Sequence, residues 1–210
     1  MKKYLIRFRD YTNAIINNRN KKRLKNKDFS LISSNCVGGF ILHNLNIHFN
    51  TPTINLFFYA EDYIKFLENL KENLSADIIE VRDLNLGYPV GKINDEITIH
   101  FMHYKNFNEA KKKWQERARR VDFNNLFIMM TDRDGCDEKS IKKFDNLPFE
   151  NKVIFTHKPY PNIKSAFFIK EFIEEESVGH LFQYKRGIQG LLGYKYYDNF
   201  DYVSFFNNSN

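Results

Sequence analysis

Short apolar runs alternate with amphipathic helical segments along most of this sequence, and the alternation leaves few folds open. Two runs, residues 126–130 and 152–156, are apolar almost throughout, which is typical of strands buried on both faces of a parallel sheet. A polar loop follows each run, and residues 137–144 then have a helical pattern. The sequence therefore predicts a three-layer α/β fold, in which helices cover both faces of a mostly parallel sheet.

The other elements are expected on the same grounds. Further strands are expected at residues 29–33, 53–59, 78–81 and 96–104, and further helices at residues 40–49, 61–74 and 108–121. Asn108 is the expected N-cap of the last of these helices. The segment after Gly193 is rich in Tyr and Phe and gives no clear pattern. With 210 residues, 42% of them hydrophobic, the chain can bury a large core, so we expect one domain over residues 29–210.

The first 28 residues carry the positive charge of the chain. They contain ten Lys and Arg against two Asp, a balance of +8, whereas the whole chain has a net charge of +6. Four apolar residues recur here at helical spacing: Tyr4, Phe8, Tyr11 and Ile15. This pattern predicts an amphipathic N-terminal helix that forms a basic arm over residues 1–28. Such a helix can pack on the domain with its basic face in solvent, or make peripheral contact with a membrane.

Neither a membrane-spanning helix nor a secretory signal is expected. No stretch approaches the ~20 consecutive apolar residues that cross a bilayer as a helix. No uninterrupted apolar block follows the N-terminal basic residues. Cys36 and Cys136 are too few for a disulfide framework, and neither stands at zinc-motif spacing to a His or Cys. We therefore expect a cytoplasmic protein that the basic arm can associate with a membrane. Nucleic acid is not an expected partner, because no nucleic-acid-binding motif accompanies the charge.

Ligands of parallel sheets bind beyond the carboxyl ends of the strands, so the polar loops there are the first candidate sites. The loop after residues 29–33 contains four candidates: Asn35, Cys36, Gly38 and Gly39. A helix start lowers the pKa of a nearby thiol, and glycine N–H groups can hold an oxyanion or phosphate. The loop suits substrate binding or, with His103 or His157 as base, a Cys36 nucleophile. The structural alternatives are a buried Cys36 and glycines that allow close helix–sheet packing.

The loop after residues 126–130 carries Asp132, Arg133 and Asp134. Two carboxylates two residues apart can coordinate a divalent cation that neutralises a sugar-nucleotide diphosphate. Asp134 is a candidate catalytic carboxylate on this hypothesis, and Asp132 and Arg133 are candidate substrate-binding residues. Turn formation alone is the alternative, because Asp followed by Gly favours a turn. We assign no set of side chains to a resident metal ion.

His157 closes the second buried strand and is the best-placed general base, since His exchanges protons near neutral pH. Lys158 can bind a phosphate or carboxylate, and Tyr160 can stack on a sugar ring. His100 and His103 are three apart in an expected strand and therefore face opposite sides. His103 is expected on the apolar side as a hydrogen-bonded core or boundary residue, or else as a substrate contact.

Segments along the chain also resemble those of a bacterial family. The Ser-Asn-Cys-Val-Gly-Gly run at residues 34–39 is similar to a Ser-Asn-Asn-Cys-Trp-Gly-Gly signature, with Val37 where Trp is usual. Further similar segments lie at residues 51–57, 62–67, 88–91, 99–104, 113–117, 132–136, 144–148 and 151–157. Together these segments, within residues 20–206, resemble the uncharacterised exopolysaccharide biosynthesis protein family, a domain of unknown function numbered 1919.

This resemblance implies a role in capsule or exopolysaccharide synthesis. We hypothesise a transferase of a glycosyl or related group that acts on a carbohydrate, a sugar nucleotide or a lipid-linked intermediate. Two alternatives stay open, a non-catalytic accessory or glycan-binding protein and a Cys-dependent O-acyltransferase. No Walker loop, Gly-x-Gly-x-x-Gly or Gly-x-Ser-x-Gly motif occurs, so NTP hydrolysis, dinucleotide chemistry and serine hydrolysis are not expected. The case for one active site requires Cys36, Asp132 and His157 to share one rim of the sheet and to be open to solvent there.

Overall fold

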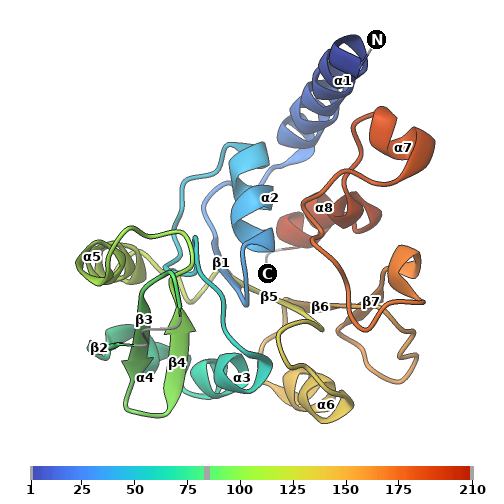
Figure 1. Cartoon of the computed structure of the whole chain (residues 1–210). Coiled ribbons are helices and arrows are strands. Elements are labelled where there is room, and N and C mark those ends of the chain that lie inside the picture. The colour runs from blue at the N-terminus through green and yellow to red at the C-terminus, as the bar shows by residue number, and fades with distance from the viewer. Residues whose placement is uncertain (1, 83–85, 209–210) are drawn as a thin grey trace.

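The computed structural model describes residues 2–82 and 86–208 and contains two sheets in this part of the chain. The main sheet has the order β1-β5-β6-β7, and all its neighbouring strands are parallel (Figure 1). Its strands are β1 (Ser30–Ser33), β5 (Leu126–Thr131), β6 (Lys152–Thr156) and β7 (Ala166–Phe168). The smaller sheet is antiparallel and consists of β2 (Ile78–Val81), β3 (Val90–Ile93) and β4 (Ile97–His100). The expected α/β fold with a mostly parallel sheet is confirmed, and the antiparallel sheet is an addition to it.

Helices cover both faces of the main sheet. Along β5, Phe127 and Met129 point into one hydrophobic cluster, whereas Ile128 and Met130 point into the other. This alternation explains why the strand reads as continuously apolar, since both of its faces are buried. The first cluster contains side chains of α2 and α8, and the second those of α3, α4, α5 and α6. The helices are α1 (Lys2–Arg23), α2 (Val37–Leu45), α3 (Ala60–Glu68), α4 (Leu70–Ser75), α5 (Phe107–Ala118), α6 (Glu138–Asn146), α7 (Gly187–Leu191) and α8 (Tyr202–Asn207), with short 3₁₀ turns at Lys170–Phe172 and Tyr196–Asn199.

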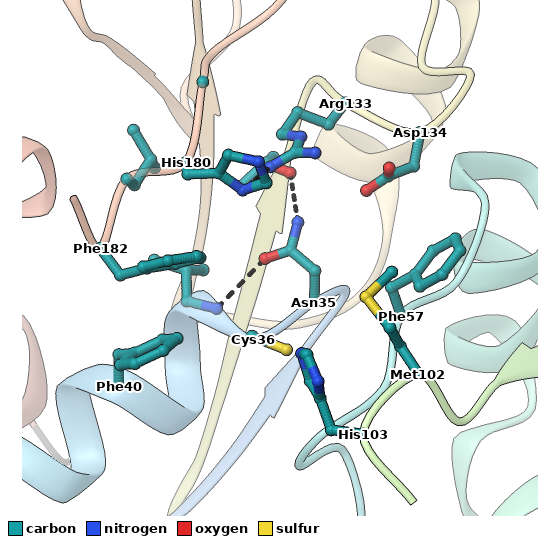
Figure 2. A pocket seen from close by; sticks show the side chains of 14 residues that line it. Asn35, Cys36, Phe40, Phe57, Met102, His103, Arg133, Asp134, His180 and Phe182 are labelled. Carbon is teal, nitrogen blue, oxygen red and sulfur yellow. Dashed lines mark hydrogen bonds between the residues drawn. The ribbon is translucent and has the colours of Figure 1, made fainter. Parts of the chain in front are cut away.

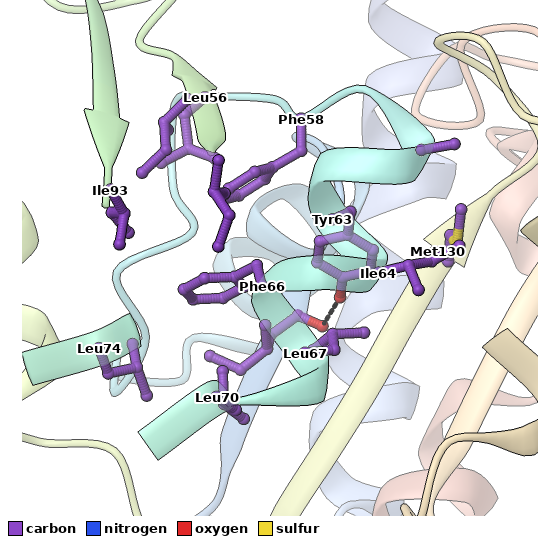
Figure 3. Close-up of a cluster of buried hydrophobic side chains, with 14 of the residues drawn as sticks. Leu56, Phe58, Tyr63, Ile64, Phe66, Leu67, Leu70, Leu74, Ile93 and Met130 are labelled. Carbon is purple, nitrogen blue, oxygen red and sulfur yellow. Dashed lines mark hydrogen bonds between the residues drawn. The ribbon is translucent and has the colours of Figure 1, made fainter. Parts of the chain in front are cut away.

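Tyr63 of α3 ties the helix layer to the sheet. Its buried hydroxyl (Figure 3) lies 2.9 Å from the carbonyl oxygen of Ile32 in β1 and 3.1 Å from that of Met129 in β5, and its one proton is shared between them. The single expected helix at residues 61–74 is divided at Asn69, where the backbone leaves the helical region. The side-chain amide of Asn73 donates to the Phe66 carbonyl near the end of α3, so part of the break is satisfied internally.

The strand expected at residues 53–59 is wrong. This segment makes an isolated bridge between Phe57 and His100 and forms no regular strand in the described structure. Asn55 has a φ of 63°, which is incompatible with extended backbone and interrupts any pairing. The apolar residues here are buried by packing rather than by a place in the sheet.

Three other boundaries differ from expectation. β3 was not among the expected strands, and the strand expected at residues 96–104 ends at His100, where the Met102 N–H bonds back to the His100 carbonyl. Helix α5 is capped by Asn106, whose side-chain oxygen accepts the Glu109 N–H at 2.9 Å, so Asn108 lies within the helix. Helix α2 begins at Val37, three residues before the expected start.

Helix α1 is confirmed, but its expected apolar face does not pack on the body. Tyr4, Phe8, Tyr11 and Ile15 are all exposed. The buried face instead carries Asn13, Ile16 and Asn20. The Asn13 side chain donates to the Gly193 carbonyl and that of Asn20 to the Tyr202 hydroxyl, both at 2.7 Å. The division into an arm and a domain stays a prediction. None of the helices in the described ranges combines the length and apolarity needed to cross a bilayer.

Candidate functional site

A cavity of about 250 Å³ lies where β1 and β5 end (Figure 2). Its lining comes from the two loops that follow these strands, from the segment at residues 179–182, and from two short stretches beside the antiparallel sheet. The lining residues are Asn35, Cys36, Val37, Phe40, Phe57, Met102, His103, Thr131, Arg133, Asp134, Gly179, His180, Leu181 and Phe182. Because β1 and β5 are adjacent and parallel, their carboxyl ends bring the two loops to one place.

Asn35 holds the two strand-end loops together. Its amide nitrogen donates to the Thr131 hydroxyl at 2.7 Å, and its amide oxygen accepts the Val37 N–H at 3.2 Å. Figure 2 shows Asn35 in the middle of the cavity wall, below Arg133 and Asp134. The second bond satisfies the first N–H group of α2, which has no partner within the helix.

Arg133, Asp134 and His180 form a polar end of the cavity. Arg133 Nη1 donates to His180 Nδ1 at 2.8 Å. Since a guanidinium cannot accept a hydrogen bond, Nδ1 is the acceptor and Nε2 carries the proton of the neutral ring. Burial lowers the pKa of His180, and the charge of Arg133 lowers it further. The imidazole is therefore a neutral hydrogen-bond donor at physiological pH.

Asp134 is the carboxylate of the same polar end. Burial raises its pKa, against the opposing effects of the Arg133 charge and a hydrogen bond from Asn35. The backbone of Asp134 has a φ of 57°. Its carbonyl oxygen accepts the N–H of Ala60, the first residue of α3, at 2.9 Å. A raised carboxyl pKa inside a cavity is typical of a group that exchanges protons with a substrate.

Aromatic and aliphatic side chains make the rest of the wall. The rings of Phe40 and Phe182 stack with their centroids 4.2 Å apart, and Phe57 and Met102 lie across the cavity from them (Figure 2). An apolar wall with a few convergent polar groups is the usual composition of a small-molecule site. Flat ring faces of this kind can also pack on the C–H face of a sugar.

Cys36 lines the cavity, and the burial of its sulfur opposes thiolate formation. Burial raises the pKa of the Cys36 thiol and outweighs the lowering effects of a backbone hydrogen bond with Leu56 and of the Arg133 charge. The sulfur lies 3.8 Å from the Leu56 carbonyl oxygen. The Val37 N–H at the start of α2 is bonded to Asn35 and is therefore not presented to the sulfur.

Gly38 and Gly39 do not line the cavity. A Cβ on Gly38 would lie 2.7 Å from the Cβ of Ser33, and the Gly38 N–H points to the Ser33 hydroxyl at 3.4 Å. A Cβ on Gly39 would lie 3.3 Å from Ile54 Cδ1. For Gly38, close packing of α2 on β1 therefore accounts for the glycine, and its N–H is not presented to a ligand in the cavity.

Asp132 and His157 lie at the same rim as Cys36 but not in the cavity. The loops after β1, β5 and β6 are neighbours, as expected, yet Asp132 is only 4% exposed and His157 8%. One Asp132 oxygen accepts both the His157 N–H at 2.6 Å and Nδ1 at 2.5 Å. The other oxygen accepts the Val178 N–H at 2.8 Å. Asp132 therefore joins two loops and does not share an opening with Asp134.

Of the other predicted site residues, some line the cavity and some do not. Lys158 is exposed and Tyr160 packs against the hydrophobic cluster of α3 and α6, and neither lines the cavity. His103 is exposed at the cavity, whereas His100 is buried and stacks on Phe57, the reverse of the expected orientation. The strand ends at His100, so its alternation does not continue to His103.

Sequence reasoning missed His180, Phe182, Phe40 and Phe57. The segment of His180 and Phe182 has neither strand nor helix periodicity, and nothing in its sequence indicates that it reaches β5. Phe40 alone had a signal, since it directly follows the Gly38-Gly39 pair in a candidate loop. Within residues 2–82 and 86–208, no three His, Cys, Asp or Glu side chains gather in a way that could hold a metal ion.

Comparison with known proteins gives the family. Residues 7–207 match a family model described as "Domain of unknown function (DUF1919)", so the match includes every segment that lines the cavity. An uncharacterized protein of Haemophilus influenzae is 49% identical over 194 residues, which are 92% of this chain and 91% of that protein. This chain belongs to the DUF1919 family.

Proposed function

We propose that this chain is a transferase that moves a glycosyl or related group onto a precursor of a bacterial surface polysaccharide, such as capsule or exopolysaccharide. One observation carries the proposal. A single cavity combines Arg133, a carboxyl of raised pKa and a neutral imidazole with an aromatic wall. The polysaccharide pathway itself comes from the sequence resemblance described above.

The polar end suits a phosphorylated sugar donor. A guanidinium has five N–H donors, and the bond to His180 uses one, so the remaining edge of Arg133 can bind phosphate oxygens. The stacked rings of Phe40 and Phe182 would receive the sugar or an apolar part of the acceptor. A sugar nucleotide or a polyprenyl phosphate sugar has both features in one molecule.

The chemistry follows from the two titratable groups. The acceptor hydroxyl oxygen would bond to the anomeric carbon as the bond from that carbon to the phosphate oxygen breaks. The hydroxyl proton would pass to the Asp134 carboxylate. Negative charge would develop on the departing phosphate, where Arg133 and the Nε2–H of His180 can stabilise it.

Non-catalytic binding of a glycan or lipid carrier is the second candidate, because apolar and aromatic side chains form most of the wall. The raised pKa of Cys36 argues against the third reading, a thiol nucleophile for O-acyl transfer. Asp132 holds two loops with both oxygens, so a divalent cation enters the proposal only as a companion of the donor's phosphates.

Calorimetric titration with nucleoside diphosphate sugars and polyprenyl phosphate analogues, with and without Mg²⁺ or Mn²⁺, tests the donor class. Arg133→Gln should weaken donor binding by about ten- to a hundredfold, since it removes hydrogen bonds to a charged group worth ~1.5–3 kcal/mol. Lys142→Gln is the matched control, because it removes a cation from the exposed face of α6.

Transfer of a radiolabelled sugar to a lipid-linked or oligosaccharide acceptor then tests catalysis. Asp134→Asn should keep donor binding and lower turnover by about a hundredfold or more, the contribution of a general base. Binding without any transfer by the unaltered protein would support the accessory role. Absence of binding across the whole panel would contradict the proposed donor class.

A further inference from the structure

Exposed apolar side chains gather at one end of the molecule. Among the described residues, nine of the fifteen large apolar side chains that are exposed lie on α1 or in the segment from α7 to Leu192. They are Tyr4, Leu5, Ile6, Phe8, Tyr11, Ile15, Ile188, Leu191 and Leu192. Tyr4 is 75% exposed and Ile188 74%, so this surface lacks cover from the described chain. A concentration of this kind marks an interaction surface.

Helix α1 presents two different faces. Asn13, Ile16 and Asn20 lie on one side and pack on the body, whereas every residue from 2 to 8 is exposed. Tyr4, Phe8, Tyr11 and Ile15 lie on the opposite side of the helix, because their spacing places them about half a turn away from the buried face. The first two turns of α1 thus project from the body with an apolar stripe facing outward.

Helix α7 lies against the other side of α1. It contacts α1, and a shallow groove between the two is lined by Leu5, Ile6 and Leu191. Figure 1 shows both helices projecting at the same end of the molecule, α1 in dark blue and α7 in orange. The groove is on the side of Leu5 and Ile6, so the exposed side chains of α7 are separate from the outward stripe of α1.

Basic side chains surround the stripe. Lys3, Arg7 and Lys22 of α1 are exposed. The one acidic residue of α1, Asp10, is paired with Arg9 at 3.2 Å. An outward face of Phe, Tyr and Ile with Lys and Arg at its margins is the composition of helices that lie in the interface of an anionic membrane.

We propose that the outward face of α1 binds the surface of an anionic lipid bilayer. The rings of Tyr4, Phe8 and Tyr11 would lie at the level of the headgroups, and the Lys and Arg side chains would contact lipid phosphates. A second copy of the chain fits this face less well. A symmetric pairing of α1 would bring like charges from both copies together, with one carboxylate per helix to offset them.

Vesicle flotation of the full chain tests this surface. The protein should float with phosphatidylcholine vesicles that contain about a third phosphatidylglycerol, and not with pure phosphatidylcholine, because each basic residue near an anionic surface contributes ~1 kcal/mol. Lys3→Gln and Arg7→Gln should each lower the partition coefficient about fivefold. High salt should lower the partition coefficient of the unaltered protein as much as both substitutions together.

The apolar stripe has its own test. Phe8→Ser with Tyr11→Ser should reduce flotation strongly, and the matched control Phe123→Ser, an exposed ring elsewhere on the chain, should leave it unchanged. All these positions are exposed, so the circular dichroism spectrum and the melting temperature should not change. Equal binding to neutral vesicles, no binding to either, or a dimer in light scattering that Phe8→Ser dissolves would overturn the proposal.

Discussion

Asp132→Asn is the substitution that best tests how the rim of the sheet is held together. The Asp132 carboxylate accepts three buried N–H groups, two from His157 and one from Val178, at 2.5 to 2.8 Å. An amide of the same size has one acceptor oxygen, and its NH₂ group would face a donor. Removing one partner from a buried charged network costs about 3–5 kcal/mol. We expect the free energy of unfolding to fall by that amount.

Urea unfolding, followed by far-UV circular dichroism and by the fluorescence of the single, buried Trp114, measures this loss. Asp137→Asn is the matched control. The Asp137 side chain is an exposed N-cap that accepts the Ser140 N–H at 2.7 Å. Asn caps helices about as well as Asp, so this control should lose less than ~1 kcal/mol. Equal losses in the two variants would refute the structural role assigned to Asp132.

Three further outcomes are expected. Gly38→Ala should lower the free energy of unfolding by about 1–3 kcal/mol through overpacking. Gly39→Ala, which meets only the end of the Ile54 side chain, should be neutral or gain up to ~1 kcal/mol of helix propensity, and equal values in urea unfolding would contradict the packing argument. Burial raises the pKa of the Cys36 thiol, and it raises the pKa of the Cys136 thiol to about 12. Single-Cys variants should therefore both react with a maleimide more slowly than glutathione at neutral pH, and fast labelling of Cys36 would support a nucleophile again. Because burial raises the pKa of Asp134 in the folded state, the folded protein binds this proton more tightly, and stability falls as pH rises above the unfolded value of about 4. Asp134→Asn should therefore melt at a higher temperature than the unaltered protein near neutral pH, with the difference closing below about pH 4, and a constant difference would contradict the assignment.

The strands of the main sheet were predictable where burial alone determines the residue types. β5 and β6 are buried on both faces, and for this reason their sequences are apolar almost throughout. β3 was missed because its short sequence with Gly91 has no pattern of its own, and it becomes a strand by pairing with β2 and β4. The reverse error occurred at residues 53–59, where apolar residues are buried without pairing and the positive φ of Asn55 prevents a strand.

The N-terminal helix shows the limit of periodicity. The spacing of apolar residues predicts the helix, but it indicates the wrong face for packing. The buried face uses Asn13 and Asn20, whose partners at Gly193 and Tyr202 are about 180 residues away in the sequence. A polar side chain with a distant partner has no local sequence signal, so periodicity did not identify the buried face. The apolar stripe is exposed on the other side of the helix.

The candidate site was also only partly predictable from the sequence. Asn35, Cys36, Arg133 and Asp134 could be found from the sequence, because adjacent parallel strands bring the loops at their carboxyl ends together. His180 could not, because no local pattern connects its segment to β5. The connection is the Asp132 carboxylate, which binds the Val178 N–H two residues before His180 and thereby places the imidazole within 2.8 Å of Arg133. The residue that the sequence suggested as a cation ligand thus positions the imidazole that the sequence missed. Asp132→Asn should accordingly disturb the cavity as well as the fold, by releasing His180 from Arg133.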